Sequence, residues 1–202
     1  MSMLDSNKYS KMKSELKHPI SYQKFCQIKE AAINTIGYSS KELQYALKAS
    51  LDIYLYLDKQ INDLESKIKE IYLSLDYRCH TIKGMGILSA AGIVAEFGNL
   101  NKFSTRNQMF AYAGLEPSKN DSGEHIGSGK MVKHGSSYLR KYLMNCAETF
   151  YTHNPIISDF YWKKRNEGKA HRVALSHVAR KLVNTIFTLE KHKVDFDPNL
   201  LK

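Results

Sequence analysis

Apolar residues recur in alternating steps of four and three between residues 43 and 75, and this pattern constrains the fold more strongly than any other. A heptad pattern sustained for more than four repeats is typical of a long coiled-coil helix. Ser39, followed by Glu42 three residues later, matches a capping box at the expected helix start. We call the pattern the heptad seam; it consists of Leu43, Leu47, Ser50, Tyr54, Leu57, Ile61, Leu64, Ile68, Ile71 and Leu75.

Two uses of this helix are open. A seam of this length favours dimerisation or a long spacer, because a helix gains most of its stability by packing its apolar face. The alternative is a helix that folds back on its own domain. The seam is longer and more regular than that of a typical core helix, so we expect a homo-oligomer formed through it.

The remainder of the chain is also predicted to be helical, which makes the fold class all-α. Residues 1–38 are expected to form a helical arm or linker, and 39–80 the coiled-coil helix. Residues 81–202 are expected to form a compact helical domain with one loop or small hairpin rich in glycine and serine.

Capping residues mark helix starts in this third part. Ser104 is expected to begin a short helix, and Ser136 or Ser137 a longer one. Pro155 suits the first turn of the helix that follows Asn154. The expected helices are 87–97, 104–112, 137–153, one from 155, and 170–191, after an earlier one at about 22–35.

The stretch TIKGMGILSAAGIVAEFGNL, from Thr81 to Leu100, resembles a helix-hairpin-helix element with Gly84 and Gly86 at its turn. The turn amides and the N-terminus of the next helix would face outward, where free N–H groups and the helix dipole attract a phosphate. Glycine turns between helices are also common for structural reasons. The pattern alone leaves both uses of the two glycines open.

A basic loop, GLEPSKNDSGEHIGSGKMVKHGSSYLR, is predicted at residues 114–140. Its glycines allow the backbone to come close to a ligand, and its serines supply hydroxyl donors. Such a loop suits a phosphate backbone, which it would hold or cut, but an ordinary polar surface hairpin has a similar composition. The cations that we expect to bind nucleic acid in this stretch are Lys119, Lys130, Lys133 and Arg140.

Positive charge is concentrated in the second half of the chain. Residues 1–80 carry 12 basic and 10 acidic side chains, a net of +2. Residues 81–202 carry 18 basic and 10 acidic side chains, a net of +8. Such a domain favours a polyanionic partner, most simply nucleic acid, although ribosome-associated and membrane-surface proteins are similarly basic.

Cations also surround aromatic residues in the segment YWKKRNEGKAHR. Aromatic rings among cations serve base stacking or phosphate contact in nucleic-acid-binding proteins. A solvated helix end over a core tryptophan would have the same sequence. The candidates for nucleic-acid binding here are Lys163, Lys164 and Arg165.

Absences from the sequence disfavour several classes of protein. The three cysteines are far apart, with no CxxC pair, so free thiols in a reducing compartment are expected. No signal peptide and no run of about 18 apolar residues occurs, so a cytoplasmic protein without a membrane partner is expected. No HxxxH, HExxH, Walker or Rossmann motif occurs and the acids are scattered, so no metal or cofactor site is expected in this chain.

Ser122 lies in the basic loop between Asp121 and Gly123. A serine hydroxyl attacks a phosphodiester poorly unless a neighbour takes its proton and cations stabilise the transition state. His125 and His134 flank the loop and are candidate bases or merely exposed histidines. Because Asp-Ser-Gly is also a common turn, the residues alone leave Ser122 as either a nucleophile or a turn residue.

The order of residues over about 80–150 resembles the C-terminal domain of the insertion-sequence-110/116/902 family of transposases. The shared pattern is a glycine turn, a small-residue helix, Glu-x-Gly, Ala-Tyr-Ala-Gly-Leu-x-Pro, Ser-Gly and Lys-x-Gly before a helix. It is met by Ile82, Gly84, Gly86, Glu96, Gly98, Phe103, Ser104, the run from Ala111 to Leu115, Pro117, Ser122, Gly123, Lys133, Gly135, Leu139 and Arg140.

The resemblance implies a role in DNA transposition guided by a structured RNA, with DNA and that RNA as partners. It places the family's catalytic serine on Ser122, which would form a covalent phosphoserine link to DNA. Full-length members begin with a RuvC-like domain whose four acidic residues bind magnesium. This sequence starts at the linker before the coiled coil, so we expect that domain, and its magnesium, to be absent from it.

Three hypotheses follow. The leading one is the C-terminal portion of such a transposase, which binds nucleic acid and supplies Ser122 to a composite active site. The second is a non-catalytic nucleic-acid-binding module that uses only the glycine turn and the basic residues. The third is an interaction subunit that dimerises with an intact transposase. Whether the chain is an enzyme by itself is left open by the sequence.

Overall fold

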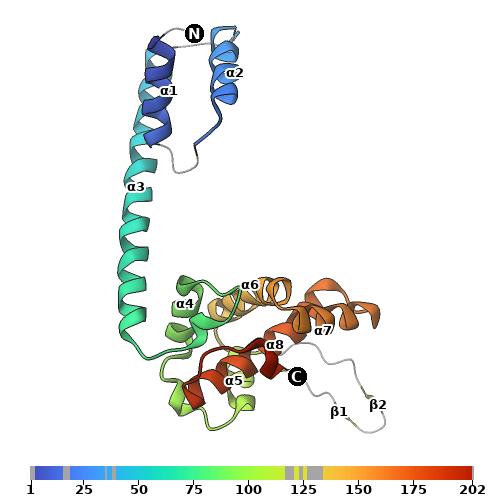
Figure 1. Cartoon of the computed structure of the whole chain (residues 1–202). Coiled ribbons are helices and arrows are strands. Elements are labelled where there is room, and N and C mark those ends of the chain that lie inside the picture. The colour runs from blue at the N-terminus through green and yellow to red at the C-terminus, as the bar shows by residue number, and fades with distance from the viewer. Residues whose placement is uncertain are drawn as a thin grey trace. The chain divides into compact units, whose positions relative to one another are not determined.

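The computed structural model describes residues 3–15, 19–34, 36–37, 40–116, 121–122, 125–126 and 134–201 of this chain (Figure 1). The described residues are mainly helical, which confirms the predicted all-α class. The only strands among them are two of two residues each. The chain divides into two compact units, 1–57 and 58–202, and each is described by itself.

The first unit holds α1 (Met3–Glu15), α2 (Tyr22–Ile33) and the beginning of α3. The Tyr9 ring on α1 lies 5.2 Å from the Tyr22 ring and 5.6 Å from the Phe25 ring, measured between centroids. The Tyr9 hydroxyl donates a hydrogen bond to the carbonyl of Ile20 at 2.9 Å. A small aromatic cluster therefore joins α1 to α2.

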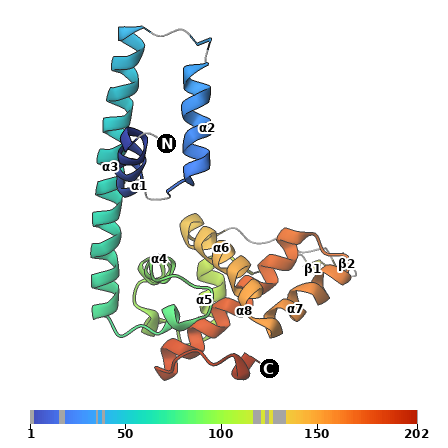
Figure 2. The ribbon, with the colours of Figure 1, turned by 45° about the horizontal axis from the view of Figure 1, so that its top comes forward.

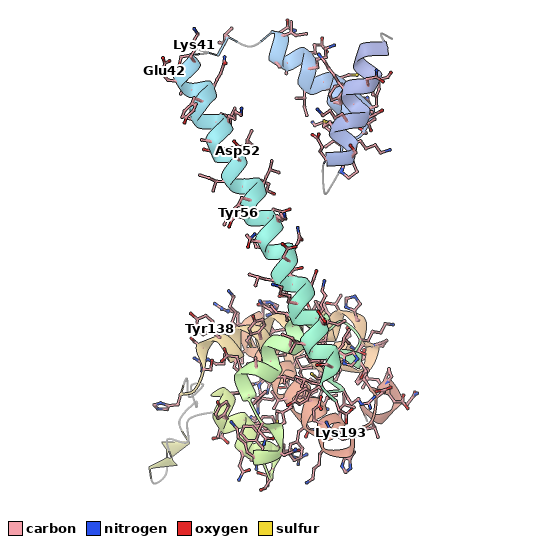
Figure 3. The ribbon with its side chains drawn as sticks, turned by 90° about the vertical axis from the view of Figure 1, so that its left-hand side faces the viewer. Lys41, Glu42, Asp52, Tyr56, Tyr138 and Lys193 are labelled. Carbon is pink, nitrogen blue, oxygen red and sulfur yellow. The ribbon has the colours of Figure 1, made fainter. Side chains whose placement is uncertain are left out.

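Helix α3 (Lys41–Ser74) contains most of the heptad seam. Its start is capped by Ser40, whose Oγ accepts a hydrogen bond from the Leu43 amide at 3.2 Å; the predicted capping residue, Ser39, lies outside the described residues. Side chains project along the helix, as Asp52 and Tyr56 do in Figure 3. The seam is exposed, with 52% of Leu57 and 58% of Leu64 open to solvent, and its pairing with a second copy stays a prediction.

The second unit is built around two long helices, α6 (Ser137–His153) and α8 (His171–His192), which pack on each other. Figure 2 shows α8 running through the middle of the unit. Around them lie α4 (Ile87–Phe97), α5 (Arg106–Ala113) and α7 (Pro155–Asn166), and short 3-10 turns at Cys79–Thr81, Leu100–Lys102 and Pro198–Leu201. The core is apolar, and its fully buried side chains include Phe97, Leu139, Leu143, Phe150, Leu182 and Ile186.

Local rules for capping and first-turn residues predicted the starts of two helices in this unit. Ser136 caps α6, and Asn154 precedes Pro155 at the first turn of α7. The cap of α5 was predicted one residue too early, because Thr105 rather than Ser104 holds that place. Gln108 decides between them, since it stands three residues after Thr105 and completes the reciprocal capping box.

A buried carboxylate joins the 3-10 turn that follows α3 to the end of α8. Oε1 of Glu190 accepts hydrogen bonds from the backbone amides of Arg78 at 2.7 Å and Cys79 at 2.8 Å. The Tyr72 hydroxyl lies 3.2 Å from Sγ of Cys79, whose pKa burial raises to about 12. This joint therefore carries an inert thiol and satisfies two amides at the start of a 3-10 turn. No helix in the described part of the chain is long and apolar enough to cross a bilayer.

Candidate functional site

Ser122 lies in a small antiparallel hairpin. Strand β1 (Asp121–Ser122) pairs with β2 (His125–Ile126), and the register places Ser122 directly opposite His125. The sequence left either a loop or a small hairpin open in this region, and these four residues pair as two short strands. Among the predicted cations of the loop, Lys119, Lys130 and Lys133 lie outside the described residues.

The hairpin segment leaves and re-enters the domain at two glycines. Gly114 ends α5 in the left-handed conformation, with φ 64°, and the next residue, Leu115, is buried. Gly135 has φ 100°, and a Cβ there would overlap the carbonyl oxygen of Tyr112. Both positions therefore require glycine, because other residues rarely adopt a positive φ and Gly135 has no room for a side chain.

Glu96, in the last turn of α4, ties these two ends together. Its Oε2 accepts a hydrogen bond from the Ser136 hydroxyl at 2.5 Å, and its backbone carbonyl accepts one from the Tyr112 hydroxyl at 3.2 Å. Ser136 Oγ in turn accepts from the Leu139 amide at 3.1 Å, as the cap of α6. We call the assembly the stem of the hairpin; it consists of Glu96, Tyr112, Gly114, Gly135 and Ser136.

Arg140 was predicted to bind nucleic acid, and the structure places it beside the stem. It lies in the first turn of α6, and its Nη1 donates to the carbonyl of His134 at 3.4 Å. Arg140 as a whole is half-buried, and its hydrogen bond to His134 is exposed to solvent. A cation therefore stands at the base of the serine-bearing segment.

The two glycines of the predicted phosphate-binding turn have different roles. At Gly84, with φ 93°, a Cβ would lie 2.7 Å from the carbonyl oxygen of Thr149 and 3.1 Å from His153 Nδ1, so this glycine lets the turn pack on α6. Gly86 is exposed, and a Cβ there would meet no atom within 4 Å. It precedes α4 without a side-chain cap, which leaves the amides of that first turn without this partner. The element before the turn is the 3-10 turn Cys79–Thr81, so the helix-hairpin-helix prediction remains unconfirmed.

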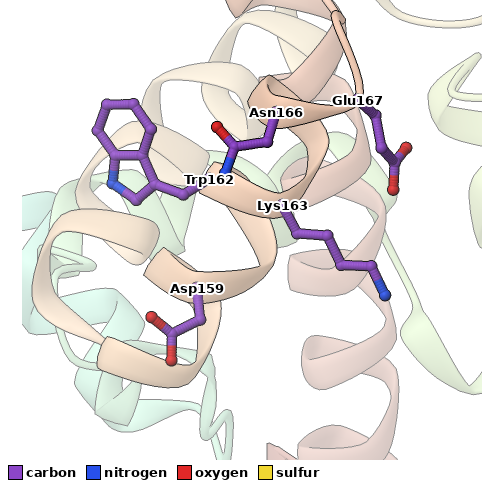
Figure 4. Close-up of a pocket in the computed structure, with 5 residues that line it drawn as sticks. All are labelled: Asp159, Trp162, Lys163, Asn166 and Glu167. Atoms are coloured by element: carbon purple, nitrogen blue, oxygen red, sulfur yellow. The ribbon is translucent and has the colours of Figure 1, made fainter.

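The three predicted cations of α7 lie in different environments. Lys163 lies on the outer face of the helix, where it lines an open depression with Asp159 and Trp162 (Figure 4). Lys164 Nζ is 2.8 Å from Glu167 Oε1, and Arg165 Nη1 donates to the carbonyl of Lys169 at 3.1 Å. Trp162 is 55% exposed, so the alternative of a core tryptophan is wrong.

The sequence predicted Lys164 as a binding residue but not the grouping of cations around His177 to which it belongs. His177 on α8 stands among Lys164, Lys169 and Arg180, and its pKa is lowered by burial first and then by these three charges. His177 follows His171 by six residues, which places the two on different faces of a helix and predicts no metal site. The available signal was the spacing on α8, where Arg180 and Lys181 follow His177 by three and four residues and so share its side of the helix.

Metal ligation finds no support among the described residues. Within the ranges given above, no group of three or more histidine, cysteine, aspartate or glutamate side chains is placed to hold an ion. Residues 117–120, 123–124 and 127–133 of the serine-bearing segment lie outside those ranges.

Comparison with known proteins identifies related sequences. Residues 76–162 match the model of the Transposase IS116/IS110/IS902 family. The chain is 31% identical over 147 residues to the insertion element IS116 uncharacterized protein of Streptomyces clavuligerus, a match that covers 71% of this chain and 37% of that protein. It is 28% identical over 153 residues to the insertion element IS900 uncharacterized protein of Mycobacterium paratuberculosis, covering 70% and 36%.

A third relative is the transposase for insertion sequence element IS1111A of Coxiella burnetii, 29% identical over 98 residues, covering 48% of this chain and 27% of the relative. The chain thus spans between 27% and 37% of the length of these three relatives. The resemblance to the C-terminal part of this transposase family is confirmed.

Proposed function

We propose that this chain provides the serine-bearing, nucleic-acid-binding part of a DNA transposase. The observation that carries the proposal is the family match over residues 76–162, which contains Ser122. Further support comes from the stem, because fixed ends restrict where the hairpin that bears Ser122 can go. The basic charge of residues 81–202 fits a nucleic-acid partner.

In the proposed reaction, Ser122 Oγ attacks the phosphorus of a DNA phosphodiester. A bond forms between that oxygen and phosphorus, and the bond from phosphorus to one sugar oxygen breaks. The serine proton passes to a base, and the released sugar oxygen takes up a proton. We propose His125 as the base, because it is paired with Ser122 in the hairpin. Arg140 at the stem would stabilise the negative charge of the crowded phosphorane.

The magnesium of such enzymes is expected on an acidic domain outside these residues. Since the described residues bring no three ligands together, we assign them no magnesium site. A divalent ion bound there would stabilise negative charge on the reacting phosphate. The composite site would then join that domain to the serine-bearing hairpin.

Three partners complete the proposal. DNA is the substrate, a structured guide RNA is expected from the resemblance, and a second copy of the chain would pair through the heptad seam. Gly86, Lys119, Lys130, Lys133 and Arg140 are proposed to contact phosphates. For Gly84 the contact with Thr149 gives a sufficient structural reason, and we propose no nucleic-acid contact there.

The test is a covalent trap. The chain is combined with the acidic domain of a related transposase and labelled DNA, and protein–DNA adducts are separated under denaturing conditions. Ser122→Ala should abolish the adduct, whereas the control Ser128→Ala should retain it. An adduct that persists in Ser122→Ala would rule out this nucleophile.

The second candidate function is a binding module without catalysis. The exposed Gly86 turn and the half-buried cations around His177 favour this candidate. Both features can bind nucleic acid without a nucleophilic residue. Salt-dependent DNA binding that is unchanged by Ser122→Ala, without an adduct in any combination, would support this candidate instead.

A further inference from the structure

Cations project from one side of α8 onto aromatic rings of its neighbours. The Lys181 ammonium lies 4.9 Å from the ring centroid of Phe160 on α7. The Arg180 guanidinium lies 4.9 Å from the ring of Phe110 on α5. Such cation–π contacts hold the charged groups at defined, partly desolvated positions. Both side chains are half-buried, so neither is an ordinary solvated surface cation.

Two further lysines approach the same place from α7 and from the turn after it. Lys164 shares the Phe160 ring with Lys181, with its ammonium 5.8 Å from the centroid. Lys169 lies in the turn between α7 and α8 and is half-buried as well. Lys164, Lys169 and Arg180, from three segments of the chain, act on His177, and Lys181 joins the group through the Phe160 ring that it shares with Lys164. We call the group the α8 cation cluster; it consists of Lys164, Lys169, His177, Arg180 and Lys181.

The cluster has little negative charge to balance it. Glu167 favours the protonated form of His177, is ion-paired with Lys164 at 2.8 Å and also interacts with the charge of Lys169, so one carboxylate faces several cations. Among the described residues, no carboxylate forms an ion pair with Lys169, Arg180 or Lys181. Partly buried like charges repel one another and destabilise the fold unless an anion joins them. Uncompensated charge of this kind marks a site built for a ligand.

We propose that the α8 cation cluster binds the phosphodiester backbone of a nucleic acid. This proposal rests on the nucleic-acid-binding function proposed above and adds a site that is separate from the hairpin and its stem. Several cations on two helices and their turn suit a polymer with one charge per phosphate better than a single small anion. Arg180 offers a planar fork for phosphate oxygens, and the lysines act as point charges.

His177 makes the site sensitive to pH. The charged and titratable groups that act on it are Lys164 and Glu167 on α7, Lys169 in the turn, and Arg180 on α8 itself. A bound phosphate would offset the three cations, so the pKa of His177 should rise when nucleic acid binds. By linkage, binding should then take up a proton and strengthen as the pH falls through the range in which His177 titrates.

The test measures binding of the full chain to two probes, a short DNA duplex and an RNA stem-loop with the same number of phosphates. Fluorescence anisotropy at several salt concentrations gives the slope of log K against log salt. The double variant Lys169→Gln/Arg180→Gln should lose about two units of slope, roughly one for each lost contact. The control Lys69→Gln/Lys191→Gln removes the same charge elsewhere and should lose less than about half a unit.

The outcomes separate the two proposals. If the wild-type chain binds neither probe, the proposed nucleic-acid function is wrong, and this site falls with it. If it binds but the cluster variant behaves like the control, only the present inference is wrong. A loss of slope with one probe alone identifies DNA or RNA as the ligand of the cluster, and a loss with both supports a site for either backbone.

A second measurement, the titration of His177, tests the site without substitution of its lysines or arginine. The His177 ring resonances, assigned with His177→Gln, are followed by NMR across pH with and without the duplex. The pKa of His177 should rise when the duplex is bound, and His177→Gln should remove most of the pH dependence of binding between about pH 5.5 and 7.5. An unchanged His177 titration in the complex would overturn the inference even if the chain binds DNA.

Discussion

The hydroxyl of Ser136 donates a hydrogen bond to Oε2 of Glu96 at 2.5 Å, across 40 positions of sequence. Oγ of Ser136 also accepts a hydrogen bond from the Leu139 amide and so caps α6. One side chain thereby fixes the point at which the serine-bearing segment rejoins the domain and links that point to α4.

Replacement of Ser136 should measure the strength of the stem. Ser136→Ala removes a helix cap, which typically costs about 1 kcal/mol, and also a hydrogen bond to a carboxylate, worth about 1.5–3 kcal/mol when fully formed. Because Glu96 is half-buried, we expect a loss of roughly 2 kcal/mol in the free energy of unfolding. Urea denaturation gives this value, and Ser137→Ala, one residue further along, should change it little. Equal losses in the two variants would contradict the role of the stem.

Substitution by alanine should lower the free energy of unfolding much more at Gly84 than at Gly86, the two glycines of the turn before α4. Gly84→Ala introduces a Cβ that lies 2.7 Å from a backbone oxygen at a positive φ, so the free energy of unfolding should fall by about 3 kcal/mol or more. Gly86→Ala meets no atom within 4 Å at φ −74° and should cost under about 1 kcal/mol. Thermal and urea unfolding of both variants test this difference. Similar losses would show that Gly84 is not held by its packing on Thr149.

The buried carboxylate of Glu190 should be essential to the joint between α3 and α8. Glu190→Ala leaves the amides of Arg78 and Cys79 without their acceptor, and we expect a loss of about 2–4 kcal/mol in the free energy of unfolding. Glu190→Gln keeps a carbonyl acceptor and should lose less. Glu148→Ala, at an exposed position of α6, is the control in the same urea titration. If Glu190→Ala unfolds like that control, the joint contributes no stability.

The free energy of unfolding should fall at mildly acid pH because of His177. Its pKa is lowered in the folded state, so the unfolded state binds the proton more tightly. Stability is therefore complete above the unfolded value of about 6.5 and declines as the pH falls from there to the lowered folded pKa. His177→Gln should flatten that part of the pH profile, whereas His192→Gln, at the exposed end of the same helix, should not. A profile that His177→Gln leaves unchanged would contradict the effect of the cluster on this imidazole.

The heptad seam should control the oligomeric state. Leu57→Asp and Leu64→Asp place a charge at exposed seam positions, where it would be buried between paired helices. Analytical ultracentrifugation should show an oligomer for the wild type and a monomer for each variant. Tyr56→Asp adds the same charge beside the seam and should leave the oligomer intact. A wild-type chain that sediments as a monomer would rule out pairing through the seam.

The sequence predicts features that depend on neighbouring residues. Ser136 and Pro155 act within one turn of their own helices, so capping rules identified those starts. The error at Ser104 has the same origin, because Thr105 can also cap a helix and Gln108, three residues later, completes the capping box with it. The all-α class likewise follows from the helical spacing of apolar residues along the chain.

Features that depend on distant residues could not be predicted in this way. From the sequence, Gly84 resembled a phosphate-binding glycine. Its packing against Thr149 involves another helix, so the residues next to Gly84 gave no sign of that structural role. The cations around His177 come from α7, α8 and their turn, so no single motif contains them. The candidate site was recognised through Ser122 and its ordered neighbours, while the hydrogen bonds of the stem became visible only in three dimensions.

The stem also makes this domain suitable for exchanging its serine-bearing segment. Leu115 is buried on one side and Ser136 is hydrogen-bonded on the other, so both attachment points are held by contacts outside residues 117–133. The entropy of closing a flexible loop grows slowly with length, by about 0.6 kcal/mol for each doubling. Segments of other lengths can therefore be grafted between the same two anchors at small cost. Relatives can therefore differ in the length of this segment without a change in the helices that anchor it.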